Sequence, residues 1–253
     1  MSATVFDLDG VIWRGGTLLG QAVEAVAAAR ERGPICFLTN AAMRAPDEVA
    51  ARLVGHGIPA EASEVMTSSL AAAALCAAGG GGRVVVVGED GARRTLAAAG
   101  LEVVDDGPAD WVVCGLDRSA TYASLARAAA AVRSGARFVA TNTDPNYPVE
   151  DDLLPGGGAL VAFLRTATGV DPIVAGKPEP PIFRAVERLV GHTGDDVELL
   201  GDSLRTDIPG GRAAGWRTTL VLTGVTTAAD LESSSVRPDR VVADLAEWLA
   251  GWS

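Results

Sequence analysis

Two carboxylates lie one residue apart at the end of a short apolar segment near the start of the chain. Asp7 and Asp9 follow residues 4–6, whose composition is typical of a buried strand, and Gly10 lets the chain turn away. Because side chains alternate along a strand, residues two apart leave it on the same side. Carboxylates this close repel each other unless a cation or a shared proton relieves them. The pair predicts a metal site, an acid–base pair, or both.

Further polar side chains follow other predicted strands. They are Thr39, Asn40, Lys177 (between Gly176 and Pro178), Asp202 and Asp207. In open parallel sheets, ligands bind beyond the carboxyl ends of the strands, so these groups are expected to lie near one another. Carboxylates suit a hard divalent cation such as magnesium, a lysine supplies a point charge for phosphate, and a hydroxyl donates to phosphate oxygens. The set therefore favours chemistry on a phosphate group.

The elements that would position these residues alternate between strand and helix patterns, which predicts an α/β fold with a parallel sheet. The expected strands are 4–6, 35–38, 83–87, 111–114, 138–141, 197–200, 218–222 and 240–242. The expected helices are 21–32, 46–54, 92–99, 122–133, about 159–168, 181–189, 208–214 and 245–249. Residues 79–82 are four glycines and are interpreted as a flexible linker. Trp248 and Trp252 are expected to pack from the last helix.

The pattern is that of one α/β unit interrupted by another. We expect a Rossmann-like core from residues 1–68 and 173–253, with an inserted α/β domain at 69–172. In the inserted block, Gly156, Gly157 and Gly158 precede a predicted helix, where an anion site, a hinge of the inserted domain or close packing would explain them. A hinge or close packing is preferred over the anion site.

Composition excludes several classes of function. The chain has 253 residues and a net charge of −11, which argues against nucleic acid or an anionic membrane as a partner. No apolar run is long enough to span a bilayer, and Asp7 interrupts the first apolar run too early for a secretory signal. The three cysteines are scattered, so we interpret them as reduced core thiols of a cytoplasmic protein and expect no zinc site.

The polar segments, taken in order, resemble the four motifs of the haloacid dehalogenase (HAD) superfamily. These motifs are Asp7-Leu8-Asp9-Gly10, Thr39-Asn40, Gly176-Lys177-Pro178 and Gly201-Asp202-Ser203 through Asp207-Ile208. The inserted block resembles the large α/β cap of the NagD-like, or p-nitrophenyl phosphatase, branch. Segments 141–144, 155–159 and 176–180 carry that likeness. The resemblance covers essentially the whole chain and implies a HAD core with an inserted cap.

The resemblance implies a role for each matching residue. Asp7 would be the nucleophile that forms an aspartyl-phosphate, and Asp9 the general acid and base. Phosphate binding falls to Thr39, Asn40 and Lys177. Magnesium would be held by Asp7, Asp202 and the main-chain carbonyl of Asp9. Asp207 would support the metal's water shell or orient Lys177.

The cap residues that would select the substrate are assigned by loop position alone. They are Asp117, Arg118, Asn146 and Tyr147. Arg118 could pair with a second anionic group of the substrate or be a solvated loop arginine. The chain departs from the family after the second motif, because Ala41-Ala42 replaces polar residues that many members carry there. That departure affects substrate details more than the chemistry.

Each site residue also has a structural explanation. The Asp7/Asp9 pair could be a solvated strand end, Thr39-Asn40 a turn, Lys177 a surface lysine, and Asp207 a helix cap. Four motifs in the expected order favour the functional interpretation of all of them.

The function expected from the sequence is a magnesium-dependent phosphomonoester hydrolase acting on a small phosphorylated metabolite. Glycerol phosphate or a similar polyol phosphate is preferred over sugar phosphates, phosphoglycolate and nucleotides. A phosphotransferase would share every motif, and a non-catalytic phosphometabolite-binding module would be expected to lose part of the set. A dehalogenase would not need Asp9, Asp202 and Asp207. The partner is a small phosphate ester, and both a monomer and a homodimer stay open.

Overall fold

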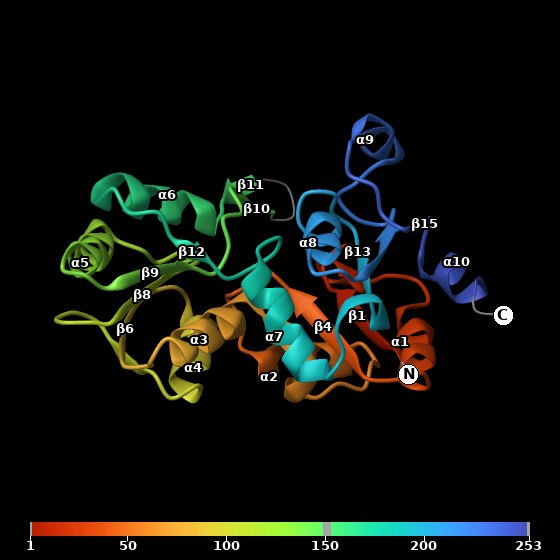
Figure 1. The fold of residues 1–253 in the computed structure, drawn as a ribbon, viewed down its shortest axis with the longest axis horizontal. Helices are drawn as coiled ribbons and strands as arrows, with labels where there is room; N and C mark the ends of the chain where they lie inside the picture. The colour runs from red at the N-terminus through yellow and green to blue at the C-terminus, as the bar shows by residue number, and fades with distance from the viewer. Residues whose placement is uncertain (1, 149–152, 252–253) are drawn as a thin grey trace. The chain divides into compact units, whose positions relative to one another are not determined.

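The computed structural model describes residues 2–148 and 153–251 (Figure 1). The chain divides into two compact units, each described by itself below. The core unit contains residues 1–39, 47–66 and 183–253, and the inserted unit contains residues 40–46 and 67–182. The sequence-based boundaries at 68/69 and 172/173 stay a prediction.

The core unit is built on a six-stranded sheet with the order β15-β14-β13-β1-β4-β5. Its strands are β1 (Ala3–Asp7), β4 (Ile35–Thr39), β5 (Val65–Thr67), β13 (Val197–Gly201), β14 (Arg217–Val221) and β15 (Arg240–Val242). The pairs β1–β13, β1–β4, β13–β14 and β14–β15 are parallel. On one side of β1 the sheet continues with β4 and β5, and on the other side with β13, β14 and β15. The strand order therefore reverses beside β1, the place where open α/β sheets bind ligands.

Register places three site residues at one edge of this sheet. Phe6 pairs with Leu200, so Asp7 and Asp202 end neighbouring strands. Asp7 itself pairs with Leu38, which puts Thr39 at the end of the strand on the other side.

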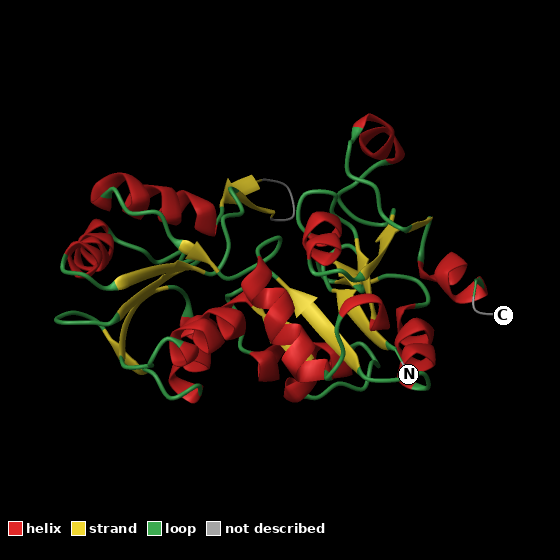
Figure 2. Cartoon of the chain, viewed as in Figure 1, coloured by secondary structure: helices red, strands yellow, loops and turns green. Residues whose placement is uncertain are grey.

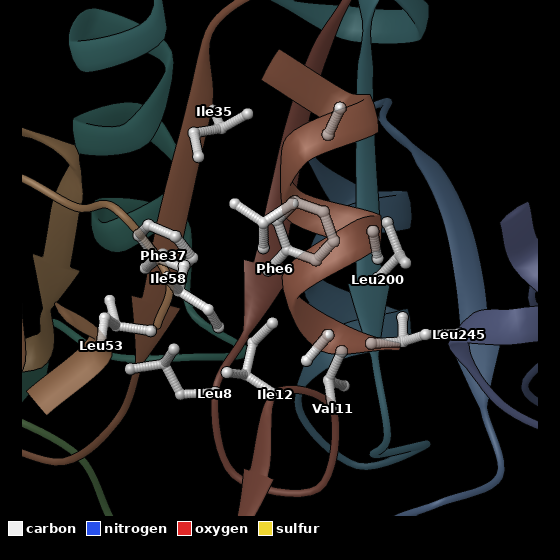
Figure 3. Close-up of a cluster of buried hydrophobic side chains, with 14 of the residues drawn as sticks. Phe6, Leu8, Val11, Ile12, Ile35, Phe37, Leu53, Ile58, Leu200 and Leu245 are labelled. Atoms are coloured by element: carbon white, nitrogen blue, oxygen red, sulfur yellow. The ribbon is translucent and has the colours of Figure 1, made fainter. Parts of the chain in front are cut away.

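The core unit buries one face of the sheet under α1 (Ala22–Arg30) and α10 (Leu245–Ala250). Figure 3 shows Phe37, Phe6 and Leu200 in a row on three strands, with Leu245 on the side of Leu200. The rings of Phe6 and Trp248 meet edge to face with centroids 5.8 Å apart, and Trp248 is fully buried. The expectation that Trp248 packs is confirmed, whereas Trp252 lies outside the described residues.

The remaining helices of the core unit are α2 (Pro46–Gly55), most of α7 (Pro180–Val190), α8 (Asp207–Ala213) and α9 (Ala228–Ser233). Two single 3₁₀ turns cover Ala62–Glu64 and Gly194–Asp196. Directly after β1 the chain forms a small antiparallel hairpin, β2 (Trp13–Arg14) and β3 (Thr17–Leu18). Two-residue strands carry no detectable alternation, so the sequence did not predict this hairpin.

The inserted unit has its own sheet, with the order β12-β9-β8-β6-β7, in which all neighbouring strands are parallel. The strands are β6 (Arg83–Val87), β7 (Glu102–Val104), β8 (Trp111–Cys114), β9 (Arg137–Ala140) and β12 (Ile173–Val174). The helices are α3 (Ser68–Ala78), α4 (Asp90–Ala98), α5 (Tyr122–Arg133) and α6 (Gly157–Thr168). Helices α5 and α6 cover one face of the sheet and α3 and α4 the other (Figures 1 and 2). A separate hairpin joins β10 (Asn146–Pro148) to β11 (Leu153–Pro155).

The two glycine-rich segments, residues 79–82 and 156–158, both make close contacts in the inserted unit. Residues 79–82 are a hydrogen-bonded connection between α3 and β6, because Gly81 donates to Cys76 and accepts from the Trp111 indole at 2.9 Å. The segment therefore links two elements as expected, through hydrogen bonds of its own. Before α6, a Cβ on Gly158 would lie 2.4 Å from the Thr143 carbonyl oxygen, which shows close packing, whereas the hinge stays a prediction.

The α/β fold predicted from the sequence is confirmed, and every expected strand and helix has a counterpart. The cysteines Cys36, Cys76 and Cys114 are buried and unpaired, and burial raises the pKa of each thiol. Among the described residues, no helix is long and apolar enough to cross a bilayer. Cytoplasmic localisation stays a prediction.

Candidate active site

Three buried aspartates meet at the carboxyl edge of the core sheet. One carboxylate oxygen from each of Asp7, Asp202 and Asp207 lies within 4.8 Å of the others. Their side chains are 5%, 4% and 0% exposed, respectively. Three negative charges held this close and this far from water require compensating positive charge. An all-oxygen donor set of this kind fits a hard divalent cation.

Backbone packing determines where Asp202 lies. A Cβ on Gly224 would lie 1.8 Å from Asp202 Oδ2, and one on Gly10 would lie 2.2 Å from the same atom. Val225 donates its backbone N–H to Asp202 Oδ2 at 2.6 Å. Thr223 joins the two glycine segments, because its hydroxyl donates to the Gly10 carbonyl at 2.6 Å. The loop after β14 therefore holds this carboxylate against the turn that follows β1.

Asp207 is the first residue of α8 and lies directly against β13. A Cβ on Gly201 would lie 2.3 Å from Asp207 Cβ, so the glycine admits the side chain to the sheet edge. Ser203 donates its backbone N–H to Asp207 Oδ2 at 3.1 Å. Asp207 is thus the first helical residue of α8, after the N-cap residue Thr206, and a member of the aspartate cluster. Its role at a metal or at Lys177 stays a prediction.

Asp9 differs from the cluster because it is exposed. The indole N–H of Trp13 donates to Asp9 Oδ1 at 2.9 Å. The Asp9 carboxylate is therefore accessible to a solute. The sequence reasoning missed Trp13; a large aromatic four residues after Asp9 was the available signal.

Thr39 ends β4 beside β1 and is 3% exposed. The next two predicted phosphate-binding residues, Asn40 and Lys177, belong to the inserted unit and bond to each other. Asn40 Oδ1 accepts the backbone N–H of Lys177 at 2.8 Å, and Asn40 Nδ2 donates to the Lys177 carbonyl at 3.1 Å. Asn40 thus holds the backbone of the Lys177 turn at both of its polar groups.

The Asn40 amide also donates to Asp144 Oδ2 at 3.2 Å, and Asn142 donates to the Asn40 carbonyl at 2.8 Å. The 141–144 segment, quoted above only for its resemblance, therefore supports the residue that holds Lys177. The signal available in the sequence was the amide and carboxylate side chains of this segment, about a dozen residues before Gly156–158.

Of the candidate substrate-selecting residues, Asp117 and Arg118 lie on a loop of the inserted unit, whereas Asn146 and Tyr147, also expected on a loop, lie on a strand. Arg118 is committed to Glu89, because Nε and Nη2 both donate to that carboxylate, at 2.5 and 3.0 Å. These bonds hold the pKa of Glu89 below and that of Arg118 above their usual values. Asp117 Oδ1 accepts from the Ser119 hydroxyl at 2.7 Å, which closes a local turn. Asn146 is exposed and Tyr147 half-buried, both on β10.

Comparison with known proteins agrees with this geometry. Models of haloacid dehalogenase-like hydrolases and of HAD-hydrolase-like proteins match residues 4–102 and 174–248. A 5'-nucleotidase of Bacillus subtilis, YutF, is 38% identical over 97% of this chain and 96% of its own length. The chain belongs to the haloacid dehalogenase-like hydrolases. A D-glycerol 3-phosphate phosphatase of Mycobacterium tuberculosis is 45% identical over 89% of this HAD hydrolase and 64% of its own length.

Solved structures place the chain within the family. A p-nitrophenyl phosphatase from Archaeoglobus fulgidus superposes with a TM-score of 0.93 at 33% identity, covering 99% of this chain and 98% of its own. A glycerol phosphate phosphatase from M. tuberculosis, solved in complex with magnesium, gives 0.89 at 41% identity over 97% and 75% of the two chains. The recognised NagD-like branch is confirmed, and this HAD hydrolase is a phosphatase.

Proposed function

We propose that this HAD phosphatase hydrolyses glycerol phosphate, or a similar small polyol phosphate, through an aspartyl-phosphate on Asp7. The observation that carries the proposal is the buried cluster of Asp7, Asp202 and Asp207 at the strand-order reversal. The choice of substrate is supported by the glycerol phosphate phosphatase relative and by Arg118, whose pairing with Glu89 disfavours a second anionic group.

The aspartate cluster fits a magnesium ion. Asp7, Asp202 and the Asp9 carbonyl would hold it, and Asp207 would support its water shell. When bound, magnesium supplies positive charge that offsets the repulsion between Asp7 and the phosphate dianion. Thr39 and Lys177 would bind the phosphoryl oxygens, with Asn40 supporting Lys177.

In the first half-reaction an Asp7 oxygen attacks phosphorus, and the bond from phosphorus to the ester oxygen breaks. The departing oxygen keeps the electron pair and takes the proton of the Asp9 carboxylic acid, giving the free alcohol. In the second half-reaction water attacks phosphorus and gives a proton to the Asp9 carboxylate, and the bond from phosphorus to the Asp7 oxygen breaks, with the electron pair staying on Asp7. Inorganic phosphate leaves, and Asp7 and the proton on Asp9 are restored.

Phosphate release from a panel of phosphomonoesters tests the proposal. Glycerol 1- and 3-phosphate, 2-phosphoglycolate, glucose 6-phosphate and AMP are compared at equal concentration, with magnesium and with a chelator. The glycerol phosphates are expected to give the highest kcat/KM, and the chelator to stop release. Turnover retained by Asp7→Asn would sink the nucleophile assignment, and a preference for AMP or phosphoglycolate would overturn the substrate class.

A further inference from the structure

Trp13 makes a side-chain hydrogen bond to Asp9. Its indole Nε1–H donates to Asp9 Oδ1 at 2.9 Å. The backbone fixes the spacing of the two residues, because they form an isolated bridge and Gly10 donates to the Trp13 carbonyl at 2.7 Å. Trp13 is 3% exposed, whereas Asp9 is exposed. A buried donor therefore holds one oxygen of an accessible carboxylate.

The indole is itself held in place from its other side. The Arg52 guanidinium lies over the ring at 4.0 Å from its centroid, within the range of a cation–π contact. The His56 ring lies 6.0 Å away at 41° to the indole plane. Arg52 also donates to the carbonyl of Gly15, in the turn of the β2–β3 hairpin. The donor is thus part of a packed stack.

We propose that Trp13 is a positioning residue for the acid–base step at Asp9. By occupying Oδ1, the indole leaves Oδ2 as the oxygen that carries the transferred proton and limits rotation of the carboxylate. Proton transfer requires hydrogen-bond reach to the ester oxygen, so a carboxylate free to rotate spends less time in a productive orientation. This inference rests on the proposed function, in which Asp9 protonates the leaving oxygen.

The leaving group decides how much this positioning matters. An alkoxide such as that of glycerol phosphate is strongly basic and needs its proton as the bond from phosphorus breaks. The 4-nitrophenolate ion is stable without a proton, so its departure depends little on Asp9. The parameter kcat/KM reports the steps through alcohol release, which separates this half-reaction from the later attack of water.

The test compares Trp13→Phe with the unchanged enzyme on glycerol 3-phosphate and on 4-nitrophenyl phosphate. Phenylalanine keeps an aromatic ring under Arg52 and removes the N–H donor. We expect kcat/KM to fall about tenfold for glycerol 3-phosphate and less than about twofold for 4-nitrophenyl phosphate. Equal losses on both substrates, or no loss on either, would overturn the proposal, because a general disturbance of the site does not distinguish leaving groups.

Two further variants isolate the N–H group. A 3-benzothienyl-alanine at position 13 replaces the N–H by sulfur in a ring of nearly the same shape, and is expected to reproduce the selective loss even if Trp13→Phe fails to fold. Arg52→Met removes the cation over the ring and leaves the donor, so the ratio of the two kcat/KM values should not change. A ratio shift as large as that of Trp13→Phe would assign the effect to the stack and overturn the role of the N–H.

The variant Asp9→Asn distinguishes a failure of the positioning role of Trp13 from a failure of the proposed acid role of Asp9. If Asp9→Asn leaves kcat/KM for glycerol 3-phosphate unchanged, the acid role of Asp9 fails and the proposal fails with it. If Asp9→Asn slows that substrate while Trp13→Phe does not change the ratio, only the positioning role of Trp13 fails. With both residues substituted, the leaving-group selectivity should not exceed that of Asp9→Asn alone, because no acid is left to position.

Discussion

Asp202 occupies a space that exists only because two backbone segments lack side chains. A Cβ atom on either Gly10 or Gly224 would overlap the Oδ2 atom of Asp202. Metal ligands are commonly oriented by neighbouring groups, whose loss weakens metal binding. At the scale of single residues, the aspartate cluster therefore depends on glycines that would bind nothing themselves.

Gly224→Ala tests this dependence. The new methyl group would lie 1.8 Å from Asp202 Oδ2, so the carboxylate or the loop must shift. We expect the magnesium concentration for half-maximal activity to rise about 10- to 100-fold, measured by titrating the metal at saturating substrate. Gly16→Ala is the matched control, because nothing lies within 4 Å of a Cβ there. An unchanged magnesium requirement in Gly224→Ala would contradict the account.

At the scale of elements, α10 packs on the core sheet through its buried side chains Leu245 and Trp248. Trp248 packs on Phe6, and its indole N–H donates to Glu198 Oε1 at 3.1 Å. The helix also begins with a cap, since Asp244 Oδ1 accepts from the Glu247 backbone at 2.9 Å. A six-residue helix is too short to be stable alone, so tertiary packing supplies most of its stability.

Trp248→Ala is expected to lower the free energy of unfolding by about 3–5 kcal/mol, because it leaves a large cavity between helix and sheet. Trp248→Phe keeps an aromatic ring and should cost about 1–2 kcal/mol through a smaller void and the lost hydrogen bond to Glu198 Oε1, which still accepts from the Thr219 hydroxyl. Urea denaturation followed by circular dichroism measures both. Equal losses of unfolding free energy in the two variants would show that an aromatic ring at position 248 contributes little to stability.

The ion pair between Arg30 and Glu64 makes the stability of the fold depend on pH. Arg30 of α1 donates to both oxygens of Glu64, with Nη2–Oε2 at 2.8 Å. Burial raises the pKa of the Glu64 carboxyl, but the bonds from Arg30 and from the Glu61 backbone outweigh burial and lower it. A carboxyl with a lowered pKa in the folded state stabilises the fold above its unfolded pKa. That stability is lost as the pH falls through the folded pKa.

Glu64→Gln should therefore cost about 1 kcal/mol at pH 7. The difference from the unchanged protein should shrink once the pH falls below about 4.3, the usual glutamate pKa, and should vanish only below the lowered pKa of the folded state, where both chains carry a neutral group. Denaturation midpoints across this pH range provide the measurement. Glu31→Gln, an exposed position directly after α1, is the control and should show little difference. A cost that persists at low pH would assign the effect to packing.

At the scale of the whole molecule, the net charge of −11 provides no general attraction for an anionic substrate. Recognition of phosphate must come from local positive charge. The cluster of three buried carboxylates adds to the negative charge until a cation binds. Magnesium binding should therefore stabilise the folded chain as well as enable turnover, because the unfolded chain has no such cluster.

A thermal unfolding series with increasing magnesium tests this linkage. The unchanged protein should gain about 2.7 kcal/mol at a free magnesium concentration of 100 times Kd. Asp202→Asn should lose most of this gain. Asp106→Asn removes one exposed carboxylate outside the site and should keep it. Equal responses of the two variants would mean that magnesium acts through general charge screening.

Local sequence was sufficient for most elements. The buried apolar run before Asp7 and the run 83–87 have the length and composition of strands, and both form them. The hairpin 13–18 and the edge strands 102–104 and 173–174 were missed, because two or three residues carry no period to detect. Gly79–Gly82 links α3 to β6 as expected, but glycine content could not reveal its hydrogen bond from the distant Trp111.

The sequence by itself determined the family, the α/β architecture and the residues that carry the proposed chemistry, because these follow from short motifs at strand ends. Only the tertiary structure decided that Asp207 joins Asp7 and Asp202, that Asn40 holds the Lys177 backbone, and that Trp13 bonds to Asp9. Two of these three arrangements join segments more than a hundred residues apart. The third depends on a hairpin too short to be predicted, so each required the folded chain to bring its groups together.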